Sequence, residues 1–208
     1  MRPRRPAALA AALAGAIGLW LAAGAAEAHP HVFIDNVATL VFDQRGIAAI
    51  RLRWTFDEIF SAGIIAQFDK NKDRKFDAEE LKALKAGAFD NLQGFDYFTH
   101  LTVDDRPVPV RRVTDFAAAI EKDQLVYEFT VPLDQAVDPR RQRLVLGVYD
   151  VEYFVDIDIG GKDAVRFERS AGISCKTSVL ENPRRPIDRK STRLNSSHSR
   201  ASRMPSSA

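Results

Sequence analysis

Apolar and polar residues alternate along two neighbouring stretches near the start of the main part of the chain. Val32–Val41 alternates loosely, and Ile47–Trp54 alternates so that Ile50, Leu52 and Trp54 share one face. The intervening DQRG segment consists of residues that favour turns. The pattern therefore predicts a β-hairpin.

The apolar residues that follow recur at steps of three and four instead of two. This spacing runs from Phe56 to Phe68 and, after a polar gap, from Leu81 to Leu92. It predicts two amphipathic helices on either side of a short loop, together covering about residues 56–93.

Strand patterns then resume, and Asp104-Asp105-Arg106 supplies a turn. The predicted strands are Tyr97–Val103, Val108–Val113, Leu125–Val131, Leu144–Val151 and Tyr153–Ile159. Strands separated by turns rather than by helices favour an antiparallel sheet. We therefore expect an α+β fold, in which a helix-loop-helix is inserted into a mainly antiparallel β sheet or sandwich. Residues 29–185 are enough for one domain with a hydrophobic core.

The first 28 residues are typical of a cleavable export signal. Three arginines among the first five residues precede an uncharged run over Ala7–Ala26, and Ala26-Glu27-Ala28 offers the small residues that a signal peptidase requires. Cleavage after Ala28 makes His29 the first residue of a periplasmic protein that does not itself span the membrane. An uncleaved anchor is the alternative, because the run is nearly long enough to cross a bilayer.

Composition changes the picture at both ends of the chain. Residues 190–208 are almost wholly Ser, Arg and Ala, which predicts disorder, and they resemble translated adapter sequence that replaces a natural end. His198 in this tail is therefore not counted as a ligand. Without the signal and the tail, the 30 basic and 28 acidic residues become 23 and 27, a net charge of −4 for residues 29–189. This acidic body, which has no basic stripe, argues against a nucleic-acid partner.

The single cysteine, Cys175, is expected in an oxidising compartment, where thiols tend to pair. A buried, inert thiol is one interpretation. A thiol whose partner was lost with the natural end of the chain is the other.

Twelve residues between the predicted helices, DKNKDRKFDAEE, carry oxygen ligands at alternate positions. The ligand positions are places one, three, five, seven, nine and twelve, which are occupied by Asp69, Asn71, Asp73, Lys75, Asp77 and Glu80. Lys75, at place seven, offers its main-chain carbonyl. This is the spacing of an EF-hand calcium loop, since calcium takes six to eight oxygens.

Arg74 departs from this pattern at place six, where the sharp turn usually requires Gly. A non-Gly residue there costs on the order of 1 kcal/mol. Because Lys and Arg side chains also offset the carboxylates, we expect weak, structural calcium binding. The alternative is a solvated acidic loop that only maintains the shape of the helix pair.

The new amino terminus is the second candidate metal site. After cleavage, His29 carries both an α-amine and an imidazole, and His31 adds a third nitrogen, a set that suits nickel, cobalt, zinc or copper. Pro30 excludes a site built on deprotonated amides, because it has no amide hydrogen. A solvated, flexible end is the alternative.

Further ligands could come from His100 or from an acidic stretch. Asp150, Glu152, Asp156 and Asp158 share one strand face if no bulge intervenes, although a solvated face explains that pattern equally well. The sequence contains no Gly-rich phosphate loop, no G-x-S-x-G elbow and no H-E-x-x-H motif, so we do not expect an enzyme.

Several segments together resemble the bacterial family catalogued as domain of unknown function 1007. They are HPHVFID, RWTFDEIFSA, DKNKDRKFDAEE, DYFTHLTVDDRPV and LGVYDVEYFVDIDI, and the resemblance covers about residues 29–180. The family's amino-terminal pattern corresponds to His29, Pro30, His31 and Asp35, and its acidic loop to Asp69–Glu80. The resemblance implies a periplasmic accessory role in nickel, cobalt or zinc transport.

We therefore expect a periplasmic accessory protein that binds a transition metal at His29 and His31 and serves a membrane metal transporter. Two alternatives come from other classes. One is a calcium-stabilised structural or interaction module. The other is a copper oxidoreductase with a histidine brace, which needs a third nitrogen such as that of His100.

Overall fold

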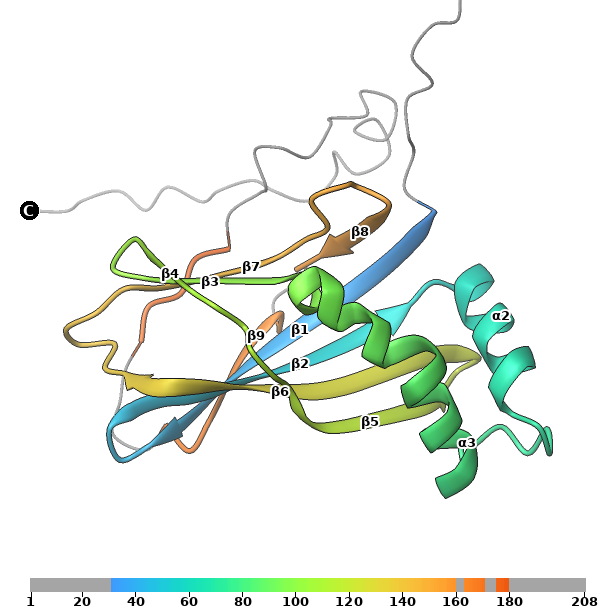
Figure 1. Ribbon diagram of the computed structural model, residues 1–208. Helices are drawn as coiled ribbons and strands as arrows, with labels where there is room; N and C mark the ends of the chain where they lie inside the picture. The colour runs from blue at the N-terminus through green and yellow to red at the C-terminus, as the bar shows by residue number, and fades with distance from the viewer. Residues whose placement is uncertain (1–30, 160–162, 171–174, 180–208) are drawn as a thin grey trace, which may run out of the picture. The chain divides into compact units, whose positions relative to one another are not determined.

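A six-stranded sheet forms the main layer of the protein in the computed structural model (Figure 1). Its spatial order is β5 (Thr114–Glu121), β6 (Gln124–Val137), β2 (Gly46–Phe56), β1 (Val32–Asp43) and β8 (Val155–Asp158), and β9 (Val165–Glu168) pairs further along β1. The β1–β2, β2–β6 and β5–β6 pairs are antiparallel, whereas β8 and β9 are parallel to β1. The predicted hairpin and the mainly antiparallel, β-rich α+β fold are confirmed.

The structure describes residues 31–159, 163–170 and 175–179. The predictions for the export signal, for His29 and for the tail at 190–208 lie outside these residues. The described residues up to Cys175 belong to one compact unit, and Lys176 begins a second.

A three-stranded antiparallel sheet contributes to the same core. Its order is β4 (Arg106–Val108), β3 (Thr99–Val103) and β7 (Leu144–Val148). Leu101 of β3 and Val148 of β7 are buried in one hydrophobic cluster with the inward side chains of β1, β2 and β6. Ile50, Leu52 and Trp54 are fully buried in that cluster, as their predicted common face requires.

The chain between β2 and β3 is helical. It contains α2 (Glu58–Phe68), α3 (Ala78–Leu84), a π-helical turn η1 (Lys85–Phe89) and a 3-10 segment η2 (Asp90–Phe98). The second predicted helix is therefore regular only as far as Leu84. Asp96, Tyr97 and Phe98 all have positive φ, so the end of η2 is not regular helix and the strand predicted from Tyr97 begins at Thr99.

Two strands were not predicted at all. β5 contains Ala117, Ala118 and Ala119, which have low strand propensity, and it is a strand because it pairs with β6. β9 pairs with β1 across more than a hundred residues of sequence. The predicted strand at 108–113 is displaced, since β4 ends at Val108.

The strand that was predicted to continue to Val151 ends at Val148, and Asp150 lies in the segment that follows it. The Asp150 Oδ1 accepts a hydrogen bond from the Glu152 amide at 2.9 Å, and its Oδ2 accepts from the amides of Phe154 at 2.9 Å and Val155 at 3.1 Å. Residues 149–154 therefore form a turn, not a strand. The expected acidic strand face is wrong, because Asp150 and Glu152 lie in this turn while Asp156 and Asp158 lie on β8.

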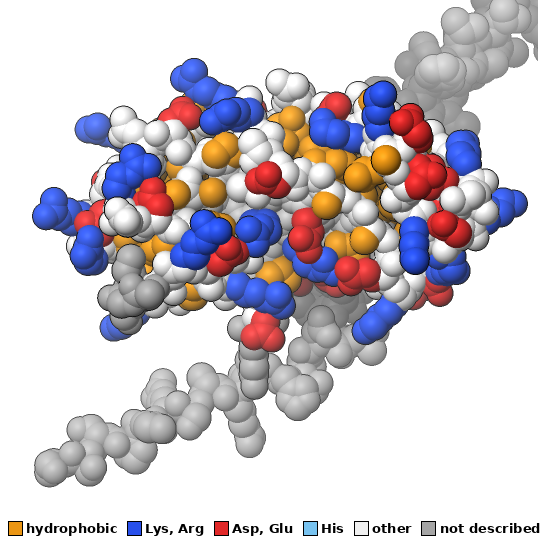
Figure 2. Space-filling model, turned by 90° about the horizontal axis from the view of Figure 1, so that it is seen from below, with side chains coloured by type: hydrophobic (Ala, Val, Ile, Leu, Met, Phe, Trp, Pro, Cys, Tyr) orange, Lys and Arg blue, Asp and Glu red, His pale blue; other side chains and the backbone are white. Residues whose placement is uncertain are grey.

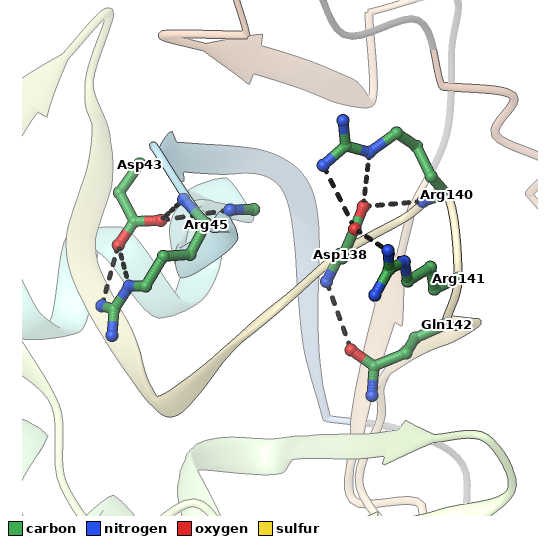
Figure 3. Close-up of polar contacts among 7 residues, drawn as sticks. Asp43, Arg45, Asp138, Arg140, Arg141 and Gln142 are labelled. Carbon is green, nitrogen blue, oxygen red and sulfur yellow. Dashed lines mark hydrogen bonds and ion pairs between the residues drawn. The ribbon is translucent and has the colours of Figure 1, made fainter.

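Two Arg-Asp contacts stabilise neighbouring turns (Figure 3). In the β1–β2 turn, Asp43 accepts from the main-chain amide of Arg45 at 2.7 Å and from its guanidinium at 2.9 Å. After β6, Asp138 accepts from the amide and guanidinium of Arg140 at 3.1 and 2.8 Å. In both pairs the side-chain hydrogen bond from Arg is the main reason why the pKa of the Asp carboxyl is lowered.

Positive and negative side chains intermingle on the face seen in Figure 2, with small hydrophobic areas between them. That face carries no continuous basic stripe. Among the described residues, no helix is long and apolar enough to cross a membrane.

Candidate cation site between the two helices

Side-chain hydrogen bonds fix the first turn of α2, the helix that precedes the acidic loop. Asp57 caps it, since Asp57 Oδ1 accepts hydrogen bonds from the amides of Ile59 and Phe60, both at 2.9 Å. The Asp57 Oδ2 accepts from the Phe33 amide of β1 at 2.9 Å. Ser61 then joins α2 to the sheet, because its hydroxyl accepts from the Leu125 amide at 2.9 Å.

Helix α3 leaves the loop through a capping box. Asp77 accepts hydrogen bonds from the Glu79 and Glu80 amides, both at 2.9 Å, and Glu80 Oε2 accepts from the Asp77 amide at 3.0 Å. The reciprocal pair satisfies amides at the start of the helix that have no partner within it. The two helix ends therefore place the loop's first and last carboxylates, Asp69 and Glu80.

Short hydrogen bonds fold the loop between these ends. The Asn71 Oδ1 accepts from the Asp73 amide at 2.8 Å, and Asp73 Oδ1 accepts from the Lys75 amide at 2.9 Å. The Asp69 Oδ2 accepts from the Arg74 amide at 3.1 Å, across the sharpest part of the turn. Arg74 has φ of 66°, the left-handed conformation that place six was expected to require.

Two buried carboxylates face the loop from its opposite ends. Asp69 is 5% exposed and Glu80 is 7% exposed. The Glu80 Oε1 accepts from the amides of Lys70 at 2.7 Å and Asn71 at 3.3 Å. By contrast, the Asp69 Oδ1 is buried and has no hydrogen-bond partner among the residues that the structure describes. A buried acceptor without a partner is costly, and here it belongs to an acidic side chain.

The predicted loop ligands thus lie on one short segment, but main-chain amides hold most of their oxygens. Within the described ranges, no three His, Cys, Asp or Glu side chains gather closely enough to hold a metal ion. A cation would therefore have to draw the exposed carboxylates, such as that of Asp73, towards Asp69.

Arg74 makes a contact that the sequence did not suggest. Its guanidinium forms an ion pair with Asp123 in the turn between β5 and β6. The two residues are far apart along the chain, and no local pattern connects them. The pair directs one of the loop's positive charges away from the loop carboxylates and towards the sheet.

The described part of the amino-terminal site is exposed. His31 donates its amide to the Phe154 carbonyl at 2.9 Å, and its ring lies 5.0 Å from that of Phe154. His31, Phe33 and Asp35 are all exposed and alternate with buried residues, so they share one face as predicted. His29 lies outside the described residues, and the structure does not test the site that it would complete.

His100 is engaged within the protein. Its Nε2 lies 3.1 Å from the Tyr149 carbonyl oxygen, and its ring stacks on that of Tyr149 at 4.0 Å. Cys175 is half-buried against the hydrophobic core.

Together these elements define a β-rich α+β protein with a helical segment between its second and third strands. The chain belongs to the family described as protein of unknown function DUF1007, whose model matches residues 14–207. This confirms the family resemblance found in the sequence.

The chain is also similar to two uncharacterised proteins. It is 32% identical over 123 residues to an uncharacterised 15.5 kDa protein in the trpE 3′ region of Spirochaeta aurantia, covering 53% of this chain and 87% of that protein. It is 27% identical over 168 residues to an uncharacterised protein of Haemophilus influenzae, covering 79% of this chain and 78% of that protein. No solved structure matches the chain.

Proposed function

We propose that this protein is a periplasmic metal-binding accessory protein, and that its loop Asp69–Glu80 is an EF-hand-like site for calcium. The observation that carries the proposal is the buried, unpartnered Oδ1 of Asp69 at place one of the loop. A divalent cation bound there would compensate the buried carboxylate and give that oxygen a partner.

The remaining ligands would come from the same loop. Asn71, Asp73 and Glu80 offer side-chain oxygens, Lys75 offers its carbonyl, and Asp77 is placed to act directly or through a water. Calcium tolerates irregular geometry and needs many oxygens, so a loop that rearranges around it is compatible with this ion. Bound calcium would neutralise the carboxylates and hold the ends of α2 and α3 together.

We expect weak affinity, in roughly the millimolar range of extracellular calcium modules. Arg74 holds a left-handed conformation without being Gly, which costs on the order of 1 kcal/mol. Lys70, Lys72 and Lys75 are exposed around the loop and repel a cation. Such a site suits a structural role rather than a rapid signal.

An NMR titration of the full chain with Ca²⁺ tests the site. We expect saturable shifts of the amides of residues 69–80, and roughly tenfold weaker binding for Asp73→Asn, equivalent to about 1.4 kcal/mol. This variant removes one ligand charge but keeps an oxygen for the Lys75 amide. Glu79→Gln is the matched control, because Glu79 is an exposed neighbour outside the ligand set. Equal affinity for Asp73→Asn and the wild type would reject the site.

We propose a second site, at the mature amino terminus, where His29 and His31 bind nickel, cobalt, zinc or copper for a membrane metal transporter. The exposure of His31, immediately before β1, favours this proposal, since transfer to another protein requires an accessible metal. An amine and imidazoles are suitable ligands for these ions.

Binding of Ni²⁺, Co²⁺, Zn²⁺ and Cu²⁺ to exported, processed protein tests this second site by calorimetry. We expect affinity to fall by at least about tenfold, or 1.4 kcal/mol, in His31→Ala and in a version with one extra residue before His29. The control, His100→Gln, should bind as the wild type does. Loss of copper binding in that control would instead support the histidine-brace alternative, and unchanged affinity in all variants would reject the terminal site.

A further inference from the structure

Three buried polar side chains lie side by side on the inner face of the six-stranded sheet. Asn36 of β1 is directly opposite Trp54 of β2, and Trp54 is directly opposite Tyr127 of β6. They are 1%, 0% and 2% exposed, respectively. The three side chains therefore form one row across neighbouring strands, which we call the polar row.

The polar row contains four polar atoms that have no hydrogen-bond partner among the described residues. They are Asn36 Oδ1, Asn36 Nδ2, Trp54 Nε1 and Tyr127 Oη. The indole nitrogen only donates, the amide donates and accepts, and the phenol does both. Because buried polar groups in folded proteins are normally satisfied, four such atoms in adjacent residues require an explanation.

Phenylalanine rings pack against both aromatic rings of the polar row. The Trp54 ring meets Phe129 edge-to-face at 4.9 Å and stacks with Phe98 at 6.2 Å. The Tyr127 ring meets Phe56 at 4.9 Å and Phe116 at 5.2 Å, both edge-to-face. These aromatic neighbours offer no strong hydrogen-bonding group, which favours a separate molecule as the partner of the polar row.

The chemistry of the row selects a small, neutral ligand. Asn and Trp carry no charge, and burial raises the pKa of Tyr127, so its hydroxyl stays protonated. A cation or an anion would have no opposite charge to compensate its loss of hydration. Water both donates and accepts, and it commonly occupies buried polar sites of this kind.

We propose that the polar row is an internal hydration site, in which ordered water bridges Asn36, Trp54 and Tyr127. The bound water satisfies side chains from three strands at once. It therefore favours the register in which Asn36, Trp54 and Tyr127 are directly opposite one another, because a one-residue slip would turn Trp54 to the other face of the sheet. The polar row shares no residue with either proposed metal site.

The direct test is NMR detection of water next to these groups in the full chain. Trp20→Phe leaves Trp54 as the only tryptophan, so one indole N–H signal remains. We expect cross-peaks between the water resonance and both the Trp54 indole proton and the Asn36 side-chain amide protons, with the sign of long-lived bound water. Absence of these cross-peaks would overturn the proposal.

A thermal measurement gives a second, independent outcome. Removing a hydroxyl that is bonded to water should lower Tm by about 2–4 °C in Tyr127→Phe, whereas removing an unbonded buried hydroxyl should leave Tm unchanged or raise it. The control, Tyr153→Phe, removes a hydroxyl from a half-buried residue outside the row and should change Tm little. An unchanged or higher Tm for Tyr127→Phe would count against the hydration site.

Discussion

At the scale of single residues, Arg53 shows how strand register decides which charges meet. Arg53 of β2 lies opposite Glu128 of β6, and its guanidinium contacts Glu128 and Glu121, each at 2.6 Å. The hydrogen bond from Arg53 is the main reason why the pKa of Glu121 is lowered. A carboxyl group whose pKa is lower in the folded than in the unfolded protein stabilises the fold at pH values above its pKa in the unfolded chain. This stabilisation is lost as the pH falls through the pKa of the folded protein. The contribution is small, because both side chains are partly exposed.

We predict that Arg53→Gln raises the pKa of Glu121 towards its ordinary value, because the charged hydrogen-bond donor is lost. An NMR titration of the Glu121 carboxyl carbon measures the change. Arg51→Gln is the control, since Arg51 pairs with Glu168 at 2.7 Å instead. Identical Glu121 titration curves in the two variants would contradict this assignment.

At the scale of elements, two glycines have opposite roles. Gly46, at the start of β2, has φ of 144°, and a side chain there would overlap the Val137 carbonyl oxygen of β6. The β2–β6 pairing therefore requires Gly at this position. Gly63 lies in the middle of α2, and a Cβ there would meet no atom within 4 Å. This glycine does not stabilise α2. It gives the unfolded chain more conformational freedom, which disfavours folding.

We predict that Gly46→Ala destabilises the protein by roughly 1–3 kcal/mol, because both the backbone conformation and the contact with Val137 become strained. Gly63→Ala should stabilise it by about 0.5–1 kcal/mol through better helix propensity. Urea unfolding of the two variants checks both signs. A stable Gly46→Ala variant would show that β2 and β6 separate easily at this end.

At the scale of the whole molecule, one core joins the two sheets to the helical segment. Phe89 of η1 stacks on Phe116 of β5 at 3.9 Å, and Phe98 at the end of η2 stacks on Trp54 of β2. Phe68 of α2 and Leu84 of α3 are buried in the same core, so the proposed calcium loop is attached at both ends to elements that the core fixes. We expect the loop to rearrange around a cation while the sheets keep their structure.

Much of the fold could be predicted because its signals are local. The alternation of apolar and polar residues predicted the faces of β1 and β2, and apolar residues three and four positions apart predicted α2 and the start of α3. Turn-favouring residues predicted the β1–β2 connection. These properties depend on residues a few positions apart. For the same reason, the loop carboxylates could be identified from spacing alone, and the family from its quoted segments.

Only the tertiary structure decided which distant residues meet. It paired β8 and β9 with β1 in parallel and made a strand of the Ala-rich β5. It also left Asp69 Oδ1 without a described partner and aligned Asn36, Trp54 and Tyr127. Local sequence determines each strand's faces, but register and strand order depend on packing between segments far apart in the chain, and these contacts aligned the polar row.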